Sequence, residues 1–365
     1  MNLERYSRQI ILKGFGEVAQ QKLLAAKVLV IGAGGLGCPA LQYLVAMGIG
    51  TIGIVDDDTI SLSNLHRQVL YNTNDIGKMK VSTAAEKLKA INPDIDINTY
   101  PAWIDQNNIL PLFKQYDFIL DGTDNFESRY LINDACVLLK KPLIFAAVSG
   151  YEGQLAIFNV ADDQQNHTNY RDLFPVPPNA GEIPNCEENG VLGAVPGVLG
   201  TMAAAEAIKL ITNIGKPLIN TLLHYNLLTQ EQYKLQISPA KNYKLPTAEI
   251  EFLNMNYHNN CTLPEAYEEI DMAKLLALKE RASTRLIDVR ERHEVPQLDP
   301  QVFSQIPMSE LAHFLESDIQ EEHIVFLCQH GIRSVTAAEY LSEKYGNAKK
   351  IYSLKGGIAK WRNHF

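Results

Sequence analysis

The sequence predicts an α/β protein of two domains: a mixed β-sheet wrapped by helices, followed by a smaller α/β domain. Three observations support this fold class. Short β-branched runs alternate with helical patterns over residues 27–150, which indicates a parallel sheet. Further strand patterns at 153–160 and 224–237 indicate an antiparallel extension of that sheet. The alternation then restarts after residue 270, and 365 residues are enough for two cores.

The expected elements follow in order along the chain. Strands are predicted at 27–32, 51–56, 117–125 and 142–150, with helices at 35–48, 81–91 and 127–139 between them. A helix at 196–211 carries Pro196 in its first turn. Beyond a stretch rich in proline and asparagine, we expect helices at 271–280 and 334–346 and strands at 285–289 and 323–327. The sequence therefore predicts a first domain over 1–245, a linker over 246–270 and a second domain over 271–365.

Composition excludes several classes of partner and location. The net charge of -9 argues against nucleic acid or an anionic membrane as a partner. No apolar run approaches the roughly 18 residues of a membrane span, and the N-terminus lacks the apolar core of a secretory signal. Five widely spaced cysteines without a C-x-x-C pair predict neither a disulfide framework nor a four-thiolate zinc site. We expect a cytoplasmic protein.

A glycine loop predicts a nucleotide site in a Rossmann-like first domain. Gly32, Gly34 and Gly37, with Gly35 inside the loop, form G-x-G-x-x-G between a predicted strand and a predicted helix. Such glycines permit close approach of phosphate to a helix N-terminus. Asp56 ends the next predicted strand, where an acidic side chain can bind ribose hydroxyls. This pattern alone leaves an NAD-dependent oxidoreductase as one alternative.

The polar residues that follow favour a triphosphate over a nicotinamide. Hydride transfer requires a nicotinamide pocket, whereas attack on a triphosphate builds charge on pyrophosphate that cations stabilise. A carboxylate at a strand end, such as Asp124, suits Mg²⁺. The polar set comprises Arg8, Asn64, Arg67, Gln68, Lys80, Asp124, Asn125 and Arg129.

Six motifs give the first 240 residues a family resemblance. RYSRQI, GAGGLG, DDDTISLSNLHRQ, GKMKVS, INP and DGTDN, in this order, resemble the MoeB/ThiF family of ubiquitin-activating-like adenylyltransferases. The resemblance implies a homodimer that uses Mg-ATP to adenylate the C-terminal glycine of a small ubiquitin-like sulfur carrier ending in Gly-Gly. Because the attacking carboxylate is already ionised near neutral pH, no side-chain base is needed. A non-catalytic carrier-binding scaffold is the other alternative.

The resemblance also implies residue roles. The glycine loop would back the nucleotide, Asp56 would bind ribose and Asp124 would hold magnesium. Arg8 would reach the phosphates from the partner subunit. The residues that would hold and neutralise the phosphates are Asn64, Arg67, Gln68 and Lys80, with Asn125 beside them in the nucleotide site. The chain departs from relatives that bind structural zinc, because Asn169, Asp172, Lys241 and Lys244 stand where thiolates would be. We therefore expect no zinc.

A second constellation places a cysteine on a tight loop. FLCQHGIRS puts Cys328 after an apolar strand, followed by Gly331, Arg333 and Ser334. Loop amides at a helix N-terminus stabilise a thiolate or persulfide. A buried structural cysteine and a phosphatase-like loop are the alternatives, and the short spacing from cysteine to arginine favours sulfur over phosphate.

The motifs LIDVRERHE and SLKGGIAKW around this loop resemble those that frame rhodanese domains. The resemblance implies that Cys328 carries persulfide sulfur, that Arg333 supports it electrostatically, and that Asp288 and Arg290 are structural. It also implies a persulfide donor such as a cysteine desulfurase, and a thiocarboxylate product that serves molybdopterin or thiamine synthesis.

The remaining cysteines differ in expected role. Cys186 lies in a predicted loop, where it could attack or relay the acyl intermediate. Cys38 and Cys136 sit in helical apolar patterns and are predicted to be structural, and no role is assigned to Cys261.

Overall fold

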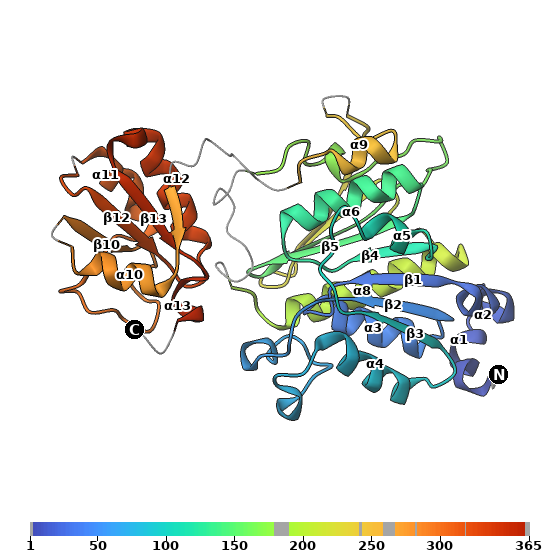
Figure 1. Ribbon diagram of the computed structural model, residues 1–365. Coiled ribbons are helices and arrows are strands. Elements are labelled where there is room, and N and C mark those ends of the chain that lie inside the picture. Colours follow the sequence, from blue (N-terminus) through green and yellow to red (C-terminus); the bar gives the residue numbers. More distant parts are fainter. Residues whose placement is uncertain are drawn as a thin grey trace. The chain divides into compact units, whose positions relative to one another are not determined.

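The computed structural model describes residues 3–178, 190–240, 243–257, 267–281, 283–317 and 319–361, which form two compact units (Figure 1). The first unit holds the described residues up to 257, and the second holds those from 267 onward. Each unit has its own sheet and its own core, so each is described by itself.

The first unit contains a mixed sheet, as predicted, and the sheet has eight strands. Its strand order is β3-β2-β1-β4-β5-β6-β7-β8. The parallel part comprises β1 (Lys27–Ile31), β2 (Thr51–Val55), β3 (Asp96–Tyr100), β4 (Phe118–Asp121) and β5 (Leu143–Ser149). The antiparallel extension comprises β6 (Glu152–Phe158), β7 (Thr221–Asn226) and β8 (Gln232–Gln236). The order reverses between β1 and β4, which opens a crevice at their carboxyl ends.

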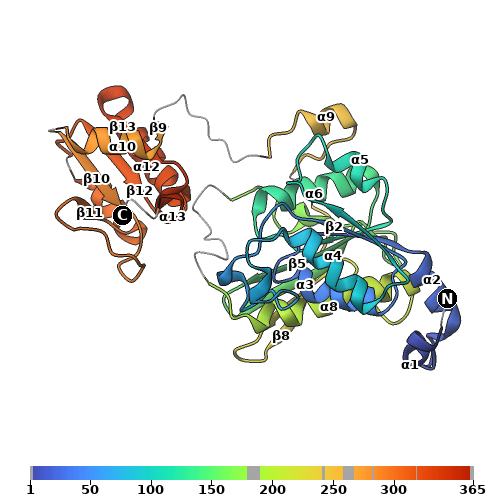
Figure 2. The ribbon, with the colours of Figure 1, turned by 60° about the horizontal axis from the view of Figure 1, so that its bottom comes forward.

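Helices cover both faces of this sheet (Figures 1 and 2). One face carries α2 (Gly16–Ala25), α3 (Gly37–Ala46), α4 (Lys80–Ile91) and α8 (Ala194–Thr212), and the other carries α5 (Ile109–Phe113), α6 (Phe126–Leu139) and α9 (Glu249–Leu253). The period of two in β1 sorts Val28 and Val30 into the first core and Leu29 and Ile31 into the second. The short elements are α1 (Ser7–Ile10), η1 (Leu3–Tyr6), η2 (Leu62–Asn64), η3 (Thr73–Asp75) and η4 (Tyr170–Asp172).

Helix α8 corrects one expectation from the sequence. Over the part of the chain that the structure describes, it is the one helix long and apolar enough to cross a membrane, with a mean hydropathy of 1.4 over its best window. However, 56% of that window is buried, and Leu199, Ala203 and Ala207 belong to the core below the sheet. The sequence predicts this helix over 196–211, and Glu206 and Lys209 interrupt its apolar run. Its packing is that of a core helix.

Hydrogen bonds hold together the corner where relatives would carry zinc. The Asp172 carboxylate accepts hydrogen bonds from the Ala240 amide at 2.6 Å and the Tyr243 hydroxyl at 2.5 Å. The Asn169 amide group donates to Tyr243 Oη at 2.7 Å. The side chains at this corner offer carboxylate, amide and hydroxyl groups. Structural zinc sites are built from thiolates and imidazoles, so these side chains do not fit one. Lys241 lies outside the described residues.

The second unit contains a five-stranded parallel sheet with the order β11-β10-β12-β13-β9. The strands are β9 (Tyr267–Ile270), β10 (Thr284–Asp288), β11 (Phe303–Gln305), β12 (His323–Leu327) and β13 (Lys350–Leu354). One face carries α10 (Met272–Lys279) and α13 (Gly357–Lys360), and the other carries α11 (Leu311–Glu316) and α12 (Ile332–Tyr345), with η5 (Met308–Glu310) and η6 (Gly346–Ala348) beside them. The segment predicted as a linker contains α9 at one end, with Phe252 buried in the first unit, and β9 at the other.

Candidate active sites

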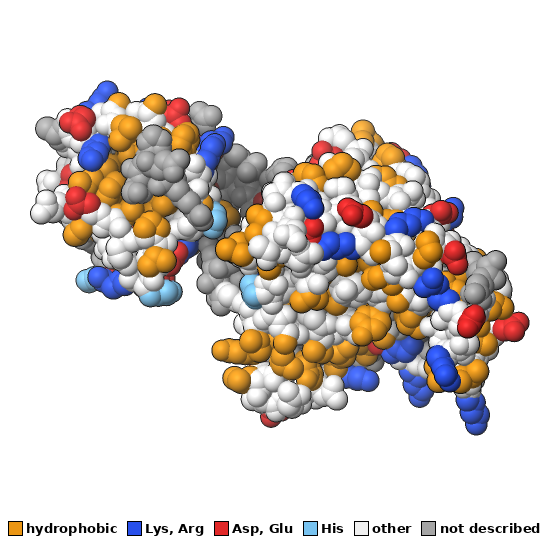
Figure 3. Space-filling model, turned by 90° about the horizontal axis from the view of Figure 1, so that it is seen from below, with side chains coloured by type: hydrophobic (Ala, Val, Ile, Leu, Met, Phe, Trp, Pro, Cys, Tyr) orange, Lys and Arg blue, Asp and Glu red, His pale blue; other side chains and the backbone are white. Residues whose placement is uncertain are grey.

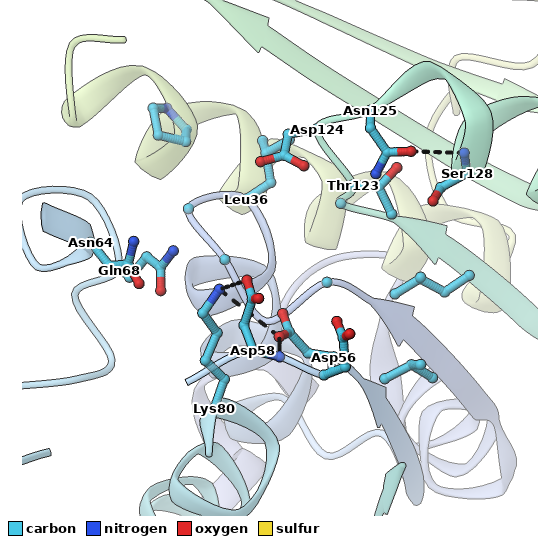
Figure 4. Close-up of a pocket in the computed structure, with 18 of the residues that line it drawn as sticks. Leu36, Asp56, Asp58, Asn64, Gln68, Lys80, Thr123, Asp124, Asn125 and Ser128 are labelled. Carbon is cyan, nitrogen blue, oxygen red and sulfur yellow. Dashed lines mark hydrogen bonds and ion pairs between the residues drawn. The ribbon is translucent and has the colours of Figure 1, made fainter. Parts of the chain in front are cut away.

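A pocket opens in the first unit at the carboxyl ends of β1, β2 and β4, beyond Ile31, Val55 and Asp121 (Figure 4). This is the edge at which doubly wound sheets bind ligands. Ten of the residues predicted for the nucleotide site line it, namely Gly32, Gly34, Gly35, Asp56, Asn64, Arg67, Gln68, Lys80, Asp124 and Asn125. The structure therefore brings together residues that are spread over more than ninety positions of the sequence.

The glycine loop is as tight as its spacing predicts. Gly32 adopts a φ of 90°, which side chains disfavour. A Cβ on Gly37, the first residue of α3, would lie 1.9 Å from the Gly32 carbonyl oxygen. Only glycine at both positions lets the chain turn from β1 into α3 and leave the helix N-terminus facing the pocket.

Asp56 anchors this loop from β2. Its carboxylate accepts hydrogen bonds from the backbone amides of Ala33 at 2.8 Å and Asp58 at 2.9 Å. Burial raises the pKa of Asp56, and the positive charge of Lys80 together with these amides opposes that rise. Asp56, which was predicted to bind ribose, therefore also holds the glycine loop in place.

The two cations of the pocket differ in their partners. Lys80 Nζ lies 2.7 Å from Asp58 Oδ2 and 3.9 Å from Asp56 Oδ1 (Figure 4). Arg67 Nη1 contacts the Ser63 carbonyl at 3.1 Å and His66 Nε2 at 2.8 Å, and no carboxylate among the described residues pairs with it. The charge of Lys80 is thus already compensated, whereas that of Arg67 is available to an anion. The role of Asp58 was missed in the sequence, although it stands in the DDD run that begins at Asp56.

The Asp124 carboxylate is exposed in the pocket. The loop that carries it is held by two buried charged residues, Asp121 and Arg129. Asp121 accepts hydrogen bonds from the amide and hydroxyl of Thr123 at 2.9 and 2.7 Å, and Arg129 Nη2 donates to the Thr123 carbonyl at 3.2 Å. Burial raises the pKa of Asp121, while Arg129 and Thr123 act in the opposite direction. Arg129 was expected among the cations around the phosphates. It does not line the pocket, and it instead supports the loop.

Asn125 and Gln68, two of the amide side chains in the site, make different contacts. Asn125 Oδ1 accepts a hydrogen bond from the Ser128 amide at 2.8 Å, which caps the N-terminus of α6. Gln68 is only 3% exposed, and its Oε1 has no hydrogen-bond partner within the described residues. A buried polar atom without a partner is costly, so Gln68 is suited to a ligand that satisfies it.

Arg8 lies away from the pocket of its own chain. It is exposed on α1, and the neighbouring Gln9 donates to the Met47 carbonyl at 3.0 Å. Met47 is the C-cap of α3, whereas the pocket faces the N-terminus of that helix. Trp103, by contrast, was not predicted for the site, yet it lines the pocket just after β3 and is 53% exposed. Strand β3 was not predicted, because DINTY is polar, and Trp103 was therefore not placed at a strand end.

The loop after β12 brings two amide donors and one hydroxyl acceptor to the Cys328 thiol. The amide nitrogens of Gly331 and Ser334 lie 3.1 and 3.4 Å from Cys328 Sγ, and the Ser334 hydroxyl lies at 3.5 Å. Gly331 has a φ of 90° and is the N-cap of α12, which begins at Ile332, two residues earlier than predicted. The sulfur is therefore held in an amide cradle at a helix N-terminus, as the sequence predicted.

Acidic residues hold the arginines beside this loop. Arg333 forms a two-pronged ion pair with Glu294, with distances of 2.6 and 2.8 Å. Burial disfavours the charged form of Glu294, but hydrogen bonds from Arg333 and from the Glu291 amide outweigh it and lower the pKa of that carboxyl. Arg290 pairs with Asp288 at 2.8 Å, and both are buried, which agrees with the structural role predicted for them.

The other described cysteines are buried in the first unit. Burial raises the pKa of Cys38 to about 12 and holds that of Cys136 well above its usual range. Both are thus poor nucleophiles. Cys186 and Cys261 lie outside the described residues.

Family models match both parts of the chain. The ThiF family matches residues 6–247, and the Rhodanese-like domain matches residues 271–364. The chain is 37% identical to the probable adenylyltransferase/sulfurtransferase MoeZ of Mycobacterium tuberculosis, over 98% of this chain and 92% of that protein. It is 34% identical to the adenylyltransferase and sulfurtransferase MOCS3 of Arabidopsis thaliana, over 98% of this chain and 82% of that protein.

A relative with a single activity in its name matches a shorter stretch of the chain. The sulfur carrier protein adenylyltransferase of Thermus thermophilus is 47% identical over 64% of this chain and 87% of that protein. Among solved structures, MccB of E. coli aligns with a TM-score of 0.56 and 23% identity, over 67% of this chain and 74% of that one. PaaA aligns with a TM-score of 0.53 and 24% identity, over 65% and 74%. These two likenesses show the fold.

Proposed function

We propose, since this chain belongs to the ThiF family and carries a rhodanese-like domain, that it adenylates the C-terminal glycine of a small ubiquitin-like sulfur carrier and converts it to a thiocarboxylate. The observation that carries this proposal is the pocket in which the glycine loop, Arg67, Lys80 and Asp124 meet at one sheet edge. Relatives over nearly the full length of the chain are named adenylyltransferase and sulfurtransferase. The carrier would belong to molybdopterin or thiamine synthesis.

The residues of the pocket fit the parts of ATP. The glycine loop and the N-terminus of α3 would receive phosphate oxygens, and Asp56, which lines the pocket, would bind the ribose. Arg67, which has no carboxylate partner among the described residues, neutralises charge on the leaving pyrophosphate. The buried Gln68 gains a polar partner, and the exposed indole of Trp103 offers a surface for adenine to stack on. The carrier glycine carboxylate attacks the α-phosphate without a side-chain base.

Asp124 fits Mg²⁺, which would shield charge on the phosphates when bound. Its carboxylate is exposed at the pocket, and no hydrogen bond or ion pair holds it within the described residues. Asp121 and Arg129 keep the loop that presents it in place.

Sulfur transfer uses Cys328 of the second unit. The terminal sulfur of its persulfide attacks the adenylated carbonyl carbon, and AMP leaves with the electron pair of the bond that breaks. A second thiolate then attacks Cys328 Sγ and releases the carrier thiocarboxylate, leaving a disulfide that an external thiol reduces. Cys186 is the candidate for that thiolate. A persulfide donor such as a cysteine desulfurase reloads Cys328, and we place this chemistry in the cytoplasm, where thiols stay reduced.

A homodimer would bring Arg8 to the site. Within its own chain Arg8 lies toward the far end of α3, and the neighbouring Ile11 and Leu12 are 72% and 58% exposed. Figure 3 shows apolar side chains on the face of the first unit that is seen from below. Exposed apolar side chains beside an arginine suit a subunit contact that delivers the guanidinium to the partner's pocket.

Carrier-dependent exchange between ATP and pyrophosphate tests the first step. The wild-type chain should exchange label only with a carrier ending in Gly-Gly, and Arg67→Ala should lose about 100-fold of that rate. Lys114→Ala, which removes a surface cation paired with Glu249, is the matched control and should exchange normally. Carrier binding without exchange would favour a scaffold, and reduction of NAD would favour an oxidoreductase.

A further inference from the structure

Three buried side chains form a series of contacts that starts at the sulfur of Cys328. Ser334 Oγ lies 3.5 Å from Cys328 Sγ, and Ser353 Oγ lies 2.9 Å from Ser334 Oγ. The exposed fractions of Cys328, Ser334 and Ser353 are 1%, 0% and 0%. The two serine hydroxyls are therefore closed off from bulk water and depend on protein groups for their hydrogen bonds.

The sheet register brings Ser353 to this place. It lies on β13, which runs parallel to β12, and it pairs with Phe326, two residues before Cys328. Ser353 begins the SLKGG stretch, which ends at Gly357. Gly357 also packs against the Cys328 loop, because a Cβ at this position would lie only 2.5 Å from the Cys328 carbonyl oxygen. The hydroxyl of Ser353 has no role in the chemistry described so far.

We propose that Ser353 is a positioning residue that directs the Ser334 hydroxyl toward the negatively charged sulfur of Cys328. The proposal rests on the sulfurtransferase function proposed above. In this proposal the Ser334 hydroxyl becomes a third donor to the sulfur, beside the amides of Gly331 and Ser334. The strength of that hydrogen bond then depends on Ser353 of the neighbouring strand β13.

Counting hydrogens shows why the second hydroxyl matters. A serine hydroxyl has one hydrogen and two lone pairs. With Cys328 as a thiol, Ser334 Oγ accepts from the thiol and from Ser353, and it donates to the Gly331 carbonyl at 3.2 Å. When the thiol loses its proton, Ser334 can turn its own hydrogen to the sulfur. The hydrogen bond from Ser353 remains and polarises Ser334, which makes it a better donor.

The state that benefits is the nucleophile that takes up sulfur. With thiosulfate as the probe, the Cys328 thiolate attacks the sulfane sulfur and forms a new S–S bond. The S–S bond of thiosulfate breaks, and sulfite leaves with its electron pair, so that the persulfide keeps one negative charge. Thiolate and persulfide anion both carry charge that the Ser334 hydroxyl can stabilise.

The test measures two properties of Cys328 in the full-length chain. The first is the rate of alkylation of Cys328 by iodoacetamide across pH, read by mass spectrometry of its peptide. The second is the rate of sulfur transfer from thiosulfate to cyanide. Ser353→Ala should slow both about three- to tenfold at neutral pH and move the alkylation profile to higher pH, because a hydrogen bond to a charged group is stronger than one to a neutral group.

Three further variants make the test specific. Ser353→Thr keeps the hydroxyl and should recover most of both rates. Ser342→Ala removes another buried serine hydroxyl, one that binds the Glu339 carbonyl, and should leave both rates unchanged. In a Ser334→Ala background, Ser353→Ala should have almost no further effect, since Ser353 acts through Ser334.

The outcomes separate this proposal from the sulfurtransferase function. Equal slowing by Ser353→Ala with and without Ser334 would overturn the proposal, as would an unmoved alkylation profile. Alkylation needs no sulfur transfer. A wild-type chain that transfers no sulfur would therefore contradict the proposed function and still leave the role of Ser353 measurable.

Discussion

The nucleotide pocket and the Cys328 loop handle negative charge in different ways. In the pocket, charged side chains add to the glycine loop and the N-terminus of α3, and its Arg67 and Asp124 lack charged partners within the described residues. The loop relies on the backbone, since the amides of Gly331 and Ser334 face the sulfur while Glu294 already binds Arg333. The first site is thus built for a large, highly charged ligand, and the second for the single charge of a sulfur that stays bonded to the chain until it is transferred.

This difference teaches where substitutions should act. Removing one charged side chain should disable the first site and leave its fold intact. In the second site, single charged side chains should affect stability more than chemistry, because the sulfur is held by main-chain groups. Each prediction below tests one side of this contrast.

The largest effect is expected for Asp124→Asn, which removes one charge and keeps the size of the side chain. Adenylation should fall about 100-fold or more, because Asp124 presents the carboxylate suited to Mg²⁺. Pyrophosphate exchange at saturating magnesium measures the loss. Sulfur transfer from thiosulfate should be unchanged in the same protein. Asp162→Asn, in a surface turn of the same unit, is the control. Normal exchange by Asp124→Asn would remove Asp124 from the mechanism.

A smaller effect is expected for Arg129→Lys, which keeps the charge and loses the planar guanidinium over Phe126 and Phe145. Because Arg129 supports the Thr123 carbonyl from behind the pocket, the loop that carries Asp124 should loosen. We expect adenylation to fall about tenfold. The magnesium concentration for half-maximal exchange should rise, which is the readout that separates positioning from a general loss of fold. An unchanged magnesium dependence would contradict this role.

Much of the first site could be predicted from the sequence because its residues follow strand ends, where topology gathers them. Its deeper layer could not. Asp58 pairs with Lys80 and Arg129 supports a loop, and both contacts depend on side-chain directions that motifs do not encode. The strands β3 and β9 were missed because DINTY and YEEI are polar, half-exposed edge strands, and β11 because it is an edge strand of three residues. The inner strand β13 was missed as well. Ser353 was invisible because only the β12–β13 register brings it to Cys328.

The smallest effect concerns Glu294→Gln in the second unit. Its carboxyl has a lowered pKa in the folded chain, so its pairing stabilises the fold above the unfolded pKa and is lost as pH falls through the lower folded value. The substitution should lower the free energy of unfolding by about 1 kcal/mol at pH 7. The difference from wild type should begin to shrink as pH falls through the ordinary glutamate pKa of about 4.3, and it should vanish only below the lower folded value. Urea unfolding at several pH values measures it, and a constant difference across pH would contradict the assignment.

The central claim is that one chain activates a carboxylate at the first site and supplies sulfur to it from the second. The most direct measurement is the mass of a Gly-Gly carrier after incubation with the full-length chain, Mg-ATP, a persulfide donor and a thiol reductant. The wild-type chain should produce the carrier thiocarboxylate, whereas Cys328→Ala should stop at the adenylate. A thiocarboxylate formed equally fast by Cys328→Ala, or no adenylate from either protein, would contradict the account.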